Sequence, residues 1–136
     1  MTGLVLLAAL FLSHYLADFC LTTRSMIVAK SDGKTLFPII FHASIHALLM
    51  GICLFIFGTT IQMLLGLFLL EFISHFIIDT IKGRLTHAYP KLADNHQKPY
   101  WIVYGMDQLL HQLIIITIWG IAIASKATTS NCHFVF

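Results

Sequence analysis

The stretch LFPIIFHASIHALLMGICLFIF, residues 36–57, decides the fold, because it is apolar over a bilayer's length and yet carries two histidines. A spanning helix needs roughly 20 mostly apolar residues. Pro38 falls in the first turn, where a helix tolerates proline. His42 and His46 are spaced i, i+4, so both lie on one face of the predicted helix. The stretch therefore predicts a membrane-spanning helix with one polar stripe.

The composition of the whole chain agrees with a membrane protein. Of its 136 residues, 58% are hydrophobic and 10% are charged, whereas soluble domains carry roughly 25% charged residues. The turn Gly58-Thr59 between the second and third apolar blocks is so short that the two helices it joins must be antiparallel neighbours. We therefore expect a single all-α domain over residues 1–136, an integral membrane four-helix up-down bundle. Its helices are expected at about residues 3–21, 36–57, 60–81 and 100–125, with polar loops at 22–35 and 82–99.

The basic residues predict which way the bundle faces. Seven of the eight lie in the two polar loops: Arg24, Lys30, Lys34, Lys82, Arg84, Lys91 and Lys98. Because positively charged loops stay in the cytoplasm, we expect both loops there and both termini outside, in a bacterial inner (plasma) membrane. Tyr100, Trp101 and Tyr104 would then lie at the cytoplasmic interface, where aromatic residues gather. The small net charge of +2 predicts no nucleic-acid partner.

Neither the first apolar block nor the cysteines point to a secreted, disulfide-bonded protein. The block has no basic region before it and holds His14 and Asp18, so we expect a retained helix rather than a cleaved signal peptide. Cys20, Cys53 and Cys132 form no C-x-x-C pair, which argues against a disulfide framework and a thiolate zinc site.

Each predicted helix carries one pair of polar residues spaced i, i+4, which places both members on one helix face. The pairs are His14 and Asp18, His42 and His46, His75 and Asp79, and Asp107 and His111. Because the helices alternate in direction, each pair lies toward the cytoplasmic end of its helix. All four pairs therefore fall at a similar depth in the cytoplasmic leaflet, and Glu71 extends the third pair by one turn.

Acidic side chains inside a bilayer are costly. One at the bilayer centre costs roughly 2.5–3.5 kcal/mol, so Asp18, Glu71, Asp79 and Asp107 together cost on the order of 10 kcal/mol at most. The whole stability of a domain is only about 5–15 kcal/mol. Mutual hydrogen bonding or metal coordination must therefore compensate.

Five imidazoles and three carboxylates form a mixed nitrogen and oxygen donor set, which suits zinc, manganese or iron. Eight ligands are too many for one tetrahedral ion, so we predict a dinuclear site that holds two divalent metal ions. The predicted ligands are His14, Asp18, His42, His46, His75, Asp79, Asp107 and His111. Soluble di-iron bundles also build their sites from inward-facing carboxylates and histidines.

Other polar residues lie close to this set. Glu71 is a candidate ligand, general base or hydrogen-bond partner between helices. Lys30 and Lys82, with Arg24, either only set the topology or bind an anionic substrate group beside the metals. Gln108 could orient a ligand or a water. The remaining histidines are expected outside the site: His87, His96 and His133.

The spacing of these residues resembles a known family. The strings that carry the likeness are His14-x-x-x-Asp18-Phe19, Met26-x-x-x-Lys30, His42-x-x-x-His46, His75-x-x-x-Asp79-x-x-Lys82 and Asp107-Gln108-x-x-His111. Over nearly the whole chain they resemble a family of short bacterial and phage membrane proteins catalogued as domain of unknown function 3307. Members often have Gln shortly after the Asp-Phe pair, where this chain has Thr22 and Thr23. The family is distantly similar to membrane-bound metal-dependent hydrolases, and that resemblance implies hydrolysis.

We therefore predict a membrane-embedded metal-dependent hydrolase that acts on a phosphoester or lipid-like substrate, such as an anionic lipid, at the cytoplasmic leaflet. In it Glu71, or a spare member of the ligand set, would serve as general base, while Lys30 and Lys82 would steady a negative group. The alternatives are a metal or proton conduit, a haem-binding bundle, and a non-enzymatic accessory protein with a structural metal. Clustering at one depth argues against a conduit, and carboxylates beside the histidines argue against haem.

Overall fold

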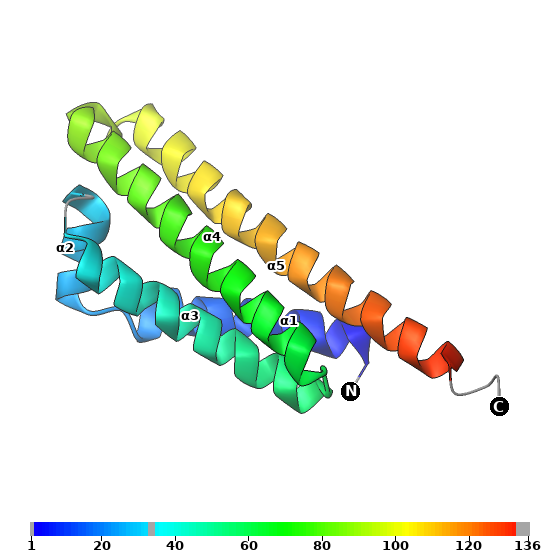
Figure 1. Ribbon diagram of the computed structural model, residues 1–136. Helices are drawn as coiled ribbons and strands as arrows, with labels where there is room; N and C mark the ends of the chain where they lie inside the picture. The colour runs from blue at the N-terminus through cyan, green and yellow to red at the C-terminus, as the bar shows by residue number, and fades with distance from the viewer. Residues whose placement is uncertain (1, 33–34, 133–136) are drawn as a thin grey trace.

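The protein is entirely helical in its regular structure over residues 2–32 and 35–132, which the computed structural model describes; side chains are described for 2–31 and 35–127. In chain order the elements are α1 (Gly3–Tyr15), the π-helical turn η1 (Leu16–Cys20), α2 (Arg24–Asp32), α3 (Leu36–Phe57), α4 (Ile61–Ala88), the 3-10 turn η2 (Pro90–Leu92) and α5 (Lys98–Cys132) (Figure 1). Within these described ranges, four stretches are long and apolar enough to cross a membrane: Gly3–Cys20, Leu36–Phe57, Ile61–Ala88 and Lys98–Ala127. The predicted all-α bundle is confirmed.

The four long helices form a ring in which each contacts two others. α1 packs against α3 and α5, and α4 packs against the same two helices from the other side. The short helix α2 lies at the end of the bundle opposite the chain termini (Figure 1) and contacts α3 and α4. Trp119 Nε1 donates to the Gly3 carbonyl at 2.7 Å, which ties the start of α1 to the late part of α5.

The turn between α3 and α4 depends on one glycine. Gly58 ends α3 with φ 83°, in the left-handed region that favours glycine. Its amide donates to the Phe55 carbonyl at 2.9 Å, and the Thr59 amide donates to the Leu54 carbonyl at 3.1 Å. Together these bonds satisfy carbonyls that the helix end would otherwise leave unpaired. The chain therefore reverses at once, and α3 and α4 become antiparallel neighbours.

The two polar segments are more helical than we expected. The prediction of a loop over 22–35 is wrong in its middle, because α2 buries Met26 and Ala29 against the bundle. The third helix was predicted to end near residue 81 but continues to Ala88, and α5 runs from Lys98 to Cys132 rather than from 100 to 125. Hydropathy marks where an apolar block ends, whereas lysine, arginine and leucine remain good helix formers beyond it.

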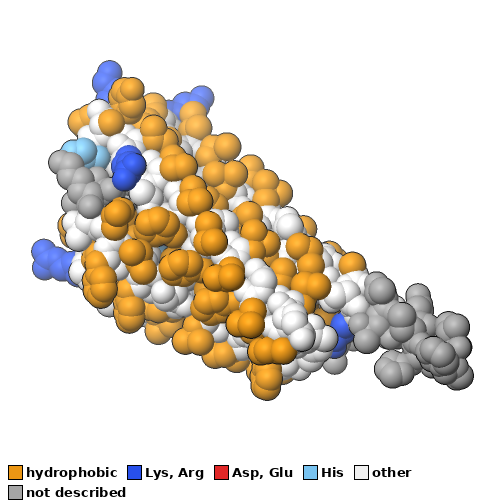
Figure 2. All heavy atoms as spheres, viewed as in Figure 1, with side chains coloured by type: hydrophobic (Ala, Val, Ile, Leu, Met, Phe, Trp, Pro, Cys, Tyr) orange, Lys and Arg blue, Asp and Glu red, His pale blue; other side chains and the backbone are white. Residues whose placement is uncertain are grey.

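The bundle carries its apolar residues on the outside and many of its polar residues inside. Large hydrophobic side chains cover the face seen in Figure 2; Phe37 and Phe55, for example, are 77% and 71% exposed. His42, His75 and Asp79, by contrast, are 0% exposed. Soluble monomers rarely show apolar patches beyond a few hundred Å². This inverted distribution is the one that a lipid environment favours.

A purely apolar core occupies the half of the bundle near the chain termini. All four long helices contribute to it, with Leu6, Leu10, Met50, Leu54, Phe57, Leu67, Ile115, Ile118 and Ala122 buried together. The buried histidines and carboxylates lie in the other half, toward α2. The apolar core and the buried polar residues thus occupy different halves of the bundle along its axis.

Replacing the turn glycine tests the α3–α4 reversal. We expect Gly58→Val to destabilise the protein by about 1–2 kcal/mol, because a β-branched residue fits the left-handed region poorly. Gly66→Ala is the matched control, since a Cβ there meets no atom within 4 Å. Unfolding by denaturant in detergent micelles measures both. Equal stability of the Gly58→Val protein and the wild type would contradict this account of the turn.

Candidate metal centre

The first ligand-bearing turn is not an ordinary α-helix. At η1 the Leu21 amide donates to the Leu16 carbonyl at 3.0 Å, an i to i−5 bond that widens the helix. The Thr22 hydroxyl donates to the carbonyls of Ala17 and Asp18 at 2.9 and 2.8 Å. π-Helical turns occur frequently at functional sites. Thr22, a departure from the family pattern in the sequence, thus stabilises the turn that carries Asp18.

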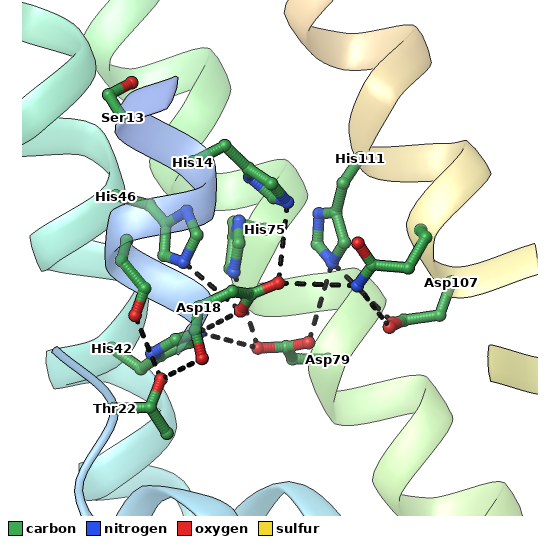
Figure 3. Close-up of polar contacts among 12 residues, drawn as sticks. Ser13, His14, Asp18, Thr22, His42, His46, His75, Asp79, Asp107 and His111 are labelled. Atoms are coloured by element: carbon green, nitrogen blue, oxygen red, sulfur yellow. Dashed lines mark hydrogen bonds and ion pairs between the residues drawn. The ribbon is translucent and has the colours of Figure 1, made fainter. Parts of the chain in front are cut away.

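The Asp18 carboxylate lies among three imidazoles from two helices. Its Oδ1 is 3.1 Å from His42 Nε2 and 3.5 Å from His46 Nε2. Its Oδ2 is 3.5 Å from Nε2 of His14, one turn earlier in the chain. Figure 3 shows these side chains converging from α1, η1 and α3.

The Asp79 carboxylate forms a second centre beside the first. Its Oδ2 is 3.5 Å from His75 Nε2 and 3.7 Å from His42 Nε2, while its Oδ1 is 3.6 Å from His111 Nε2. The His75 ring lies between those of His46 and His111, with ring centroids 3.7 and 4.1 Å away. His75 is therefore central to the cluster, and all four long helices supply side chains to it (Figure 3).

Among the residues that the structure describes, three overlapping groups of side chains have the spacing that a metal ion requires. Within each, one nitrogen or oxygen atom per residue lies within 4.8 Å of the others, and His75 belongs to all three. The groups are His14, His46, Glu71 and His75; Asp18, His42, His46 and His75; and His75, Asp79 and His111. Asp107 belongs to none of them: its Oδ2 lies 2.7 Å from Lys82 Nζ, and its Oδ1 lies 3.6 Å from His111 Nε2.

The cluster fits a metal because its donor atoms are buried and many of them have no hydrogen-bond partner. Both ring nitrogens of His14, His46 and His75 make no hydrogen bond within the described part of the chain, and Asp79 Oδ2 has only the Lys30 ammonium, at 3.1 Å, close to it. Buried polar groups are normally hydrogen-bonded, and leaving one unpaired costs a few kcal/mol. Imidazole nitrogens and carboxylate oxygens with free lone pairs are the donors that zinc, manganese and iron take. These residues could therefore hold a divalent ion.

Two lysines contact the cluster from the α2 end. Lys30 Nζ lies 3.1 Å from Asp18 Oδ1, 3.1 Å from Asp79 Oδ2 and 3.1 Å from His42 Nε2. Burial by itself would lower the pKa of the Lys30 ammonium, but the Asp79 and Asp18 carboxylates outweigh it and raise that pKa above its ordinary value. Lys82 pairs with Asp107 as described above. Lys30 thus reaches the site from α2, outside the four apolar stretches, and Lys82 reaches it from the C-terminal part of α4.

Gln108 and Arg24 have different positions relative to the cluster. Gln108 Nε2 lies 3.4 Å from an oxygen of Asp18 and 3.4 Å from an oxygen of Asp107, so it bridges η1 and α5. Arg24 instead lines a separate hollow between α2 and the start of α3, with Val28 and Pro38. The structure therefore brings Gln108 to the site and leaves Arg24 apart from it.

A cavity of about 310 Å³ lies next to the two lysines. Polar and apolar side chains share its lining: Asp18, Phe19, Thr22, Ile27, Lys30, Ser31, Lys82, Thr86, Leu92, Ala93, Tyr100, Val103, Tyr104 and Gln108. Because Asp18 belongs both to this lining and to the cluster, the cavity reaches the candidate metal centre. The sequence did not predict the cavity, since its walls come from η1, α2, α4, α5 and the loop between the last two.

The histidines and cysteines expected outside the site can be placed in part. His87 and His96 are exposed and belong to none of the three groups. Cys20 and Cys53 are free thiols. His133 and the side chain of Cys132 lie outside the described residues.

Fold and site together define a class: an all-α bundle with four helices of membrane-spanning length and a buried histidine and carboxylate cluster that could hold metal. The chain belongs to the family described as "Protein of unknown function (DUF3307)", whose model matches residues 6–136. The resemblance noted from the sequence motifs is thus confirmed at the level of the family. No curated protein and no solved structure matches the chain.

Metal content tests the centre directly. We expect protein purified in mild detergent to hold about two equivalents of a transition metal per chain, and Asp79→Ala and His75→Ala to reduce this content, because each removes a buried donor. His87→Ala is the matched control, since it removes an exposed imidazole from the same helix. Elemental analysis by mass spectrometry gives the ratio. Metal-free wild-type protein that still binds none after incubation with zinc, manganese or iron would rule out the centre.

Proposed function

We propose that the protein is a membrane-embedded metal-dependent hydrolase that cleaves a phosphoester or lipid-like substrate. The observation that carries the proposal is the set of buried imidazole nitrogens without hydrogen bonds among the described residues, with carboxylates beside them and a cavity lined by two lysines next to them. A purely structural metal would need the ligands but not the adjacent cavity. A cavity that reaches the cluster gives a substrate access to it.

The predicted ligands can be divided into two sets that have no residue in common. Asp18 with His42 and His46 would hold one ion, and Asp79 with His75 and His111 would hold a second. All six are buried or nearly so. Divalent ions bound there would supply Lewis acidity, activating water and stabilising negative charge on the scissile group. Zinc, manganese and iron all suit this donor set.

The remaining polar residues take supporting roles in this proposal. The Glu71 carboxylate lies 3.6 Å from His75 Nδ1 and does not line the cavity, which favours an orienting role toward His75 over the general base expected from the sequence. Lys30 and Lys82 line the cavity and would hold an anionic group of the substrate. Gln108 Nε2, within 3.4 Å of Asp18 and Asp107, would keep the two carboxylates in position.

The distribution of buried residues weighs against a conduit. An ion pathway has to line the full thickness of the membrane with polar groups. Here Leu6, Leu10, Leu54 and Ile118, each at most 1% exposed, fill the half of the bundle beyond the cluster. A haem would need an apolar slot, whereas the space between these histidines holds two carboxylates.

We also propose the orientation that the basic residues predict, with α2 and the α4–α5 connection in the cytoplasm of a bacterial cell and the α3–α4 turn outside. In a background without native cysteines, Thr60→Cys should react with a membrane-impermeant maleimide on intact cells. Asn95→Cys should react only after permeabilisation. Both residues are exposed. The reverse labelling pattern would invert the proposed topology and move the site to the outer leaflet.

Turnover tests the activity itself. Reconstituted protein should hydrolyse a phosphate ester such as p-nitrophenyl phosphate when loaded with metal, and activity should fall to background after chelation or in His75→Ala. His87→Ala should retain the wild-type rate, because its side chain lies outside the cluster. Released p-nitrophenol measures the rate. Protein that unfolds on chelation but hydrolyses no ester tested would favour the structural-metal alternative.

A further inference from the structure

The cavity beside the cluster is lined by two kinds of side chain. Its polar lining includes Asp18, Lys30, Lys82 and Gln108, and its apolar lining includes Phe19, Ile27 and Val103. A water-soluble substrate would leave the apolar residues without a partner, whereas an amphiphile would contact both kinds.

Two apolar residues of the cavity lining are also part of the apolar exterior of the bundle. Phe19 and Ile27 line the cavity and are at the same time 56% and 58% exposed. Phe19 belongs to η1 and Ile27 to α2, both at the end of the bundle where polar segments replace the apolar ones. A hydrocarbon chain in contact with Phe19 and Ile27 would thus lead from the cavity to the apolar exterior.

The two lysines at the cavity can contact an anion once the carboxylates beside them are bound by metal. Lys30 and Lys82 pair with three carboxylates, Asp18, Asp79 and Asp107, so these five groups alone give a balance of +2 − 3 = −1, which a bound divalent ion would turn positive. The lysine side chains are only 16% and 22% exposed, so water screens them less than it screens a surface lysine. If the proposed metals bind Asp18 and Asp79, less of the carboxylate charge is left to neutralise the lysines.

The size of the cavity limits what can be bound inside it. Small-molecule sites usually measure about 300–1,000 Å³, and this one, at about 310 Å³, is at the lower end. It has room for a headgroup and the first part of one chain. The remainder of a longer chain would stay outside, against the apolar surface.

We propose that this cavity binds a membrane-resident amphiphile with a phosphate headgroup. The headgroup lies between Lys30 and Lys82, and the hydrocarbon chain leaves along Val103, Ile27 and Phe19. The identification of this amphiphile as the substrate rests on the proposed hydrolase function; its binding does not. The inference names the substrate class and its route, from the bilayer rather than from the aqueous phase.

Binding of dodecyl phosphate to the full chain in nanodiscs of neutral lipid tests this proposal, with native mass spectrometry and calorimetry as readouts. Inorganic phosphate and dodecyl maltoside are the probes that lack the chain and the charge, respectively. We expect each to bind at least tenfold more weakly than dodecyl phosphate, because each buried methylene strengthens binding about fourfold and the lysines require an anion.

Paired variants locate the site. Val103→Trp fills the cavity, while Ile102→Trp adds the same bulk at the neighbouring position, which does not line it. Lys82→Met removes a lining charge, while Arg84→Met removes an exposed charge from the same helix. The first member of each pair should weaken dodecyl phosphate binding at least tenfold, and the second should leave it within twofold of wild type. Ala93→Trp, at an exposed lining residue of the connecting loop, gives a second blocking variant if Val103→Trp does not fold.

The outcomes separate this inference from the proposed function. If inorganic phosphate bound as tightly as dodecyl phosphate, the proposal that the ligand comes from the membrane would be wrong. If dodecyl maltoside bound as tightly as dodecyl phosphate, the proposed role of the lysine charges would be wrong. Tight binding of dodecyl phosphate that the cavity variants weaken, without any hydrolysis, would uphold the site and reject the hydrolase. Metal-dependent hydrolysis of p-nitrophenyl phosphate, with dodecyl phosphate binding unchanged in Val103→Trp and Ala93→Trp, would uphold the hydrolase and reject the amphiphile site.

Discussion

Two carboxylates, Asp18 and Asp79, are buried among five imidazoles, and the rest of the structure depends on accommodating them. A carboxylate inside an apolar bundle is unstable unless cations or hydrogen-bond donors surround it. Here His42 contacts both carboxylates, and the Lys30 ammonium lies 3.1 Å from an oxygen of each. The cluster thus holds helices α1, α3, α4 and α5 in one register, because a shift of any one would remove a partner from a buried charge.

The remainder of the bundle is organised around that requirement. The apolar core near the termini packs the four helices where no charge has to be satisfied, and the exposed apolar surface suits lipid. The π-helical turn at η1 places Asp18 against His42 and His46, and Thr22 pairs with two of the carbonyls in that turn. The geometry of the site therefore rests on rigid helices and one specialised turn rather than on long loops.

The short helix α2 connects the cluster with the surroundings. Its buried face, Met26 and Ala29, anchors it on the bundle, and Lys30 on the same face reaches the carboxylates. Its exposed Ile27 forms part of the cavity edge. One nine-residue helix thus supplies both a charge to the site and a wall to the cavity, which joins the proposed metal chemistry to the proposed binding of an amphiphile.

The sequence by itself determined the class of fold and the core of the candidate site. Apolar blocks of bilayer length predict helices because a helix satisfies its backbone hydrogen bonds within one segment, where lipid offers no partners. Pairs at i, i+4 share a helix face, so alternating helix directions bring His14, Asp18, His42, His46, His75, Asp79 and His111 to one level. Both arguments use only local geometry and chain direction, which a single sequence contains.

Only the tertiary structure decided how these residues are divided among roles. Asp107 has the same spacing as the other pairs, yet it lies against Lys82, outside the three groups with metal-ligand spacing. Glu71 lies within one group and contacts His75 rather than the cavity. The helix α2 and the cavity were not foreseen, because both depend on contacts between segments far apart in the chain. Periodicity places a side chain on a face, but the neighbouring helices determine what that side chain contacts.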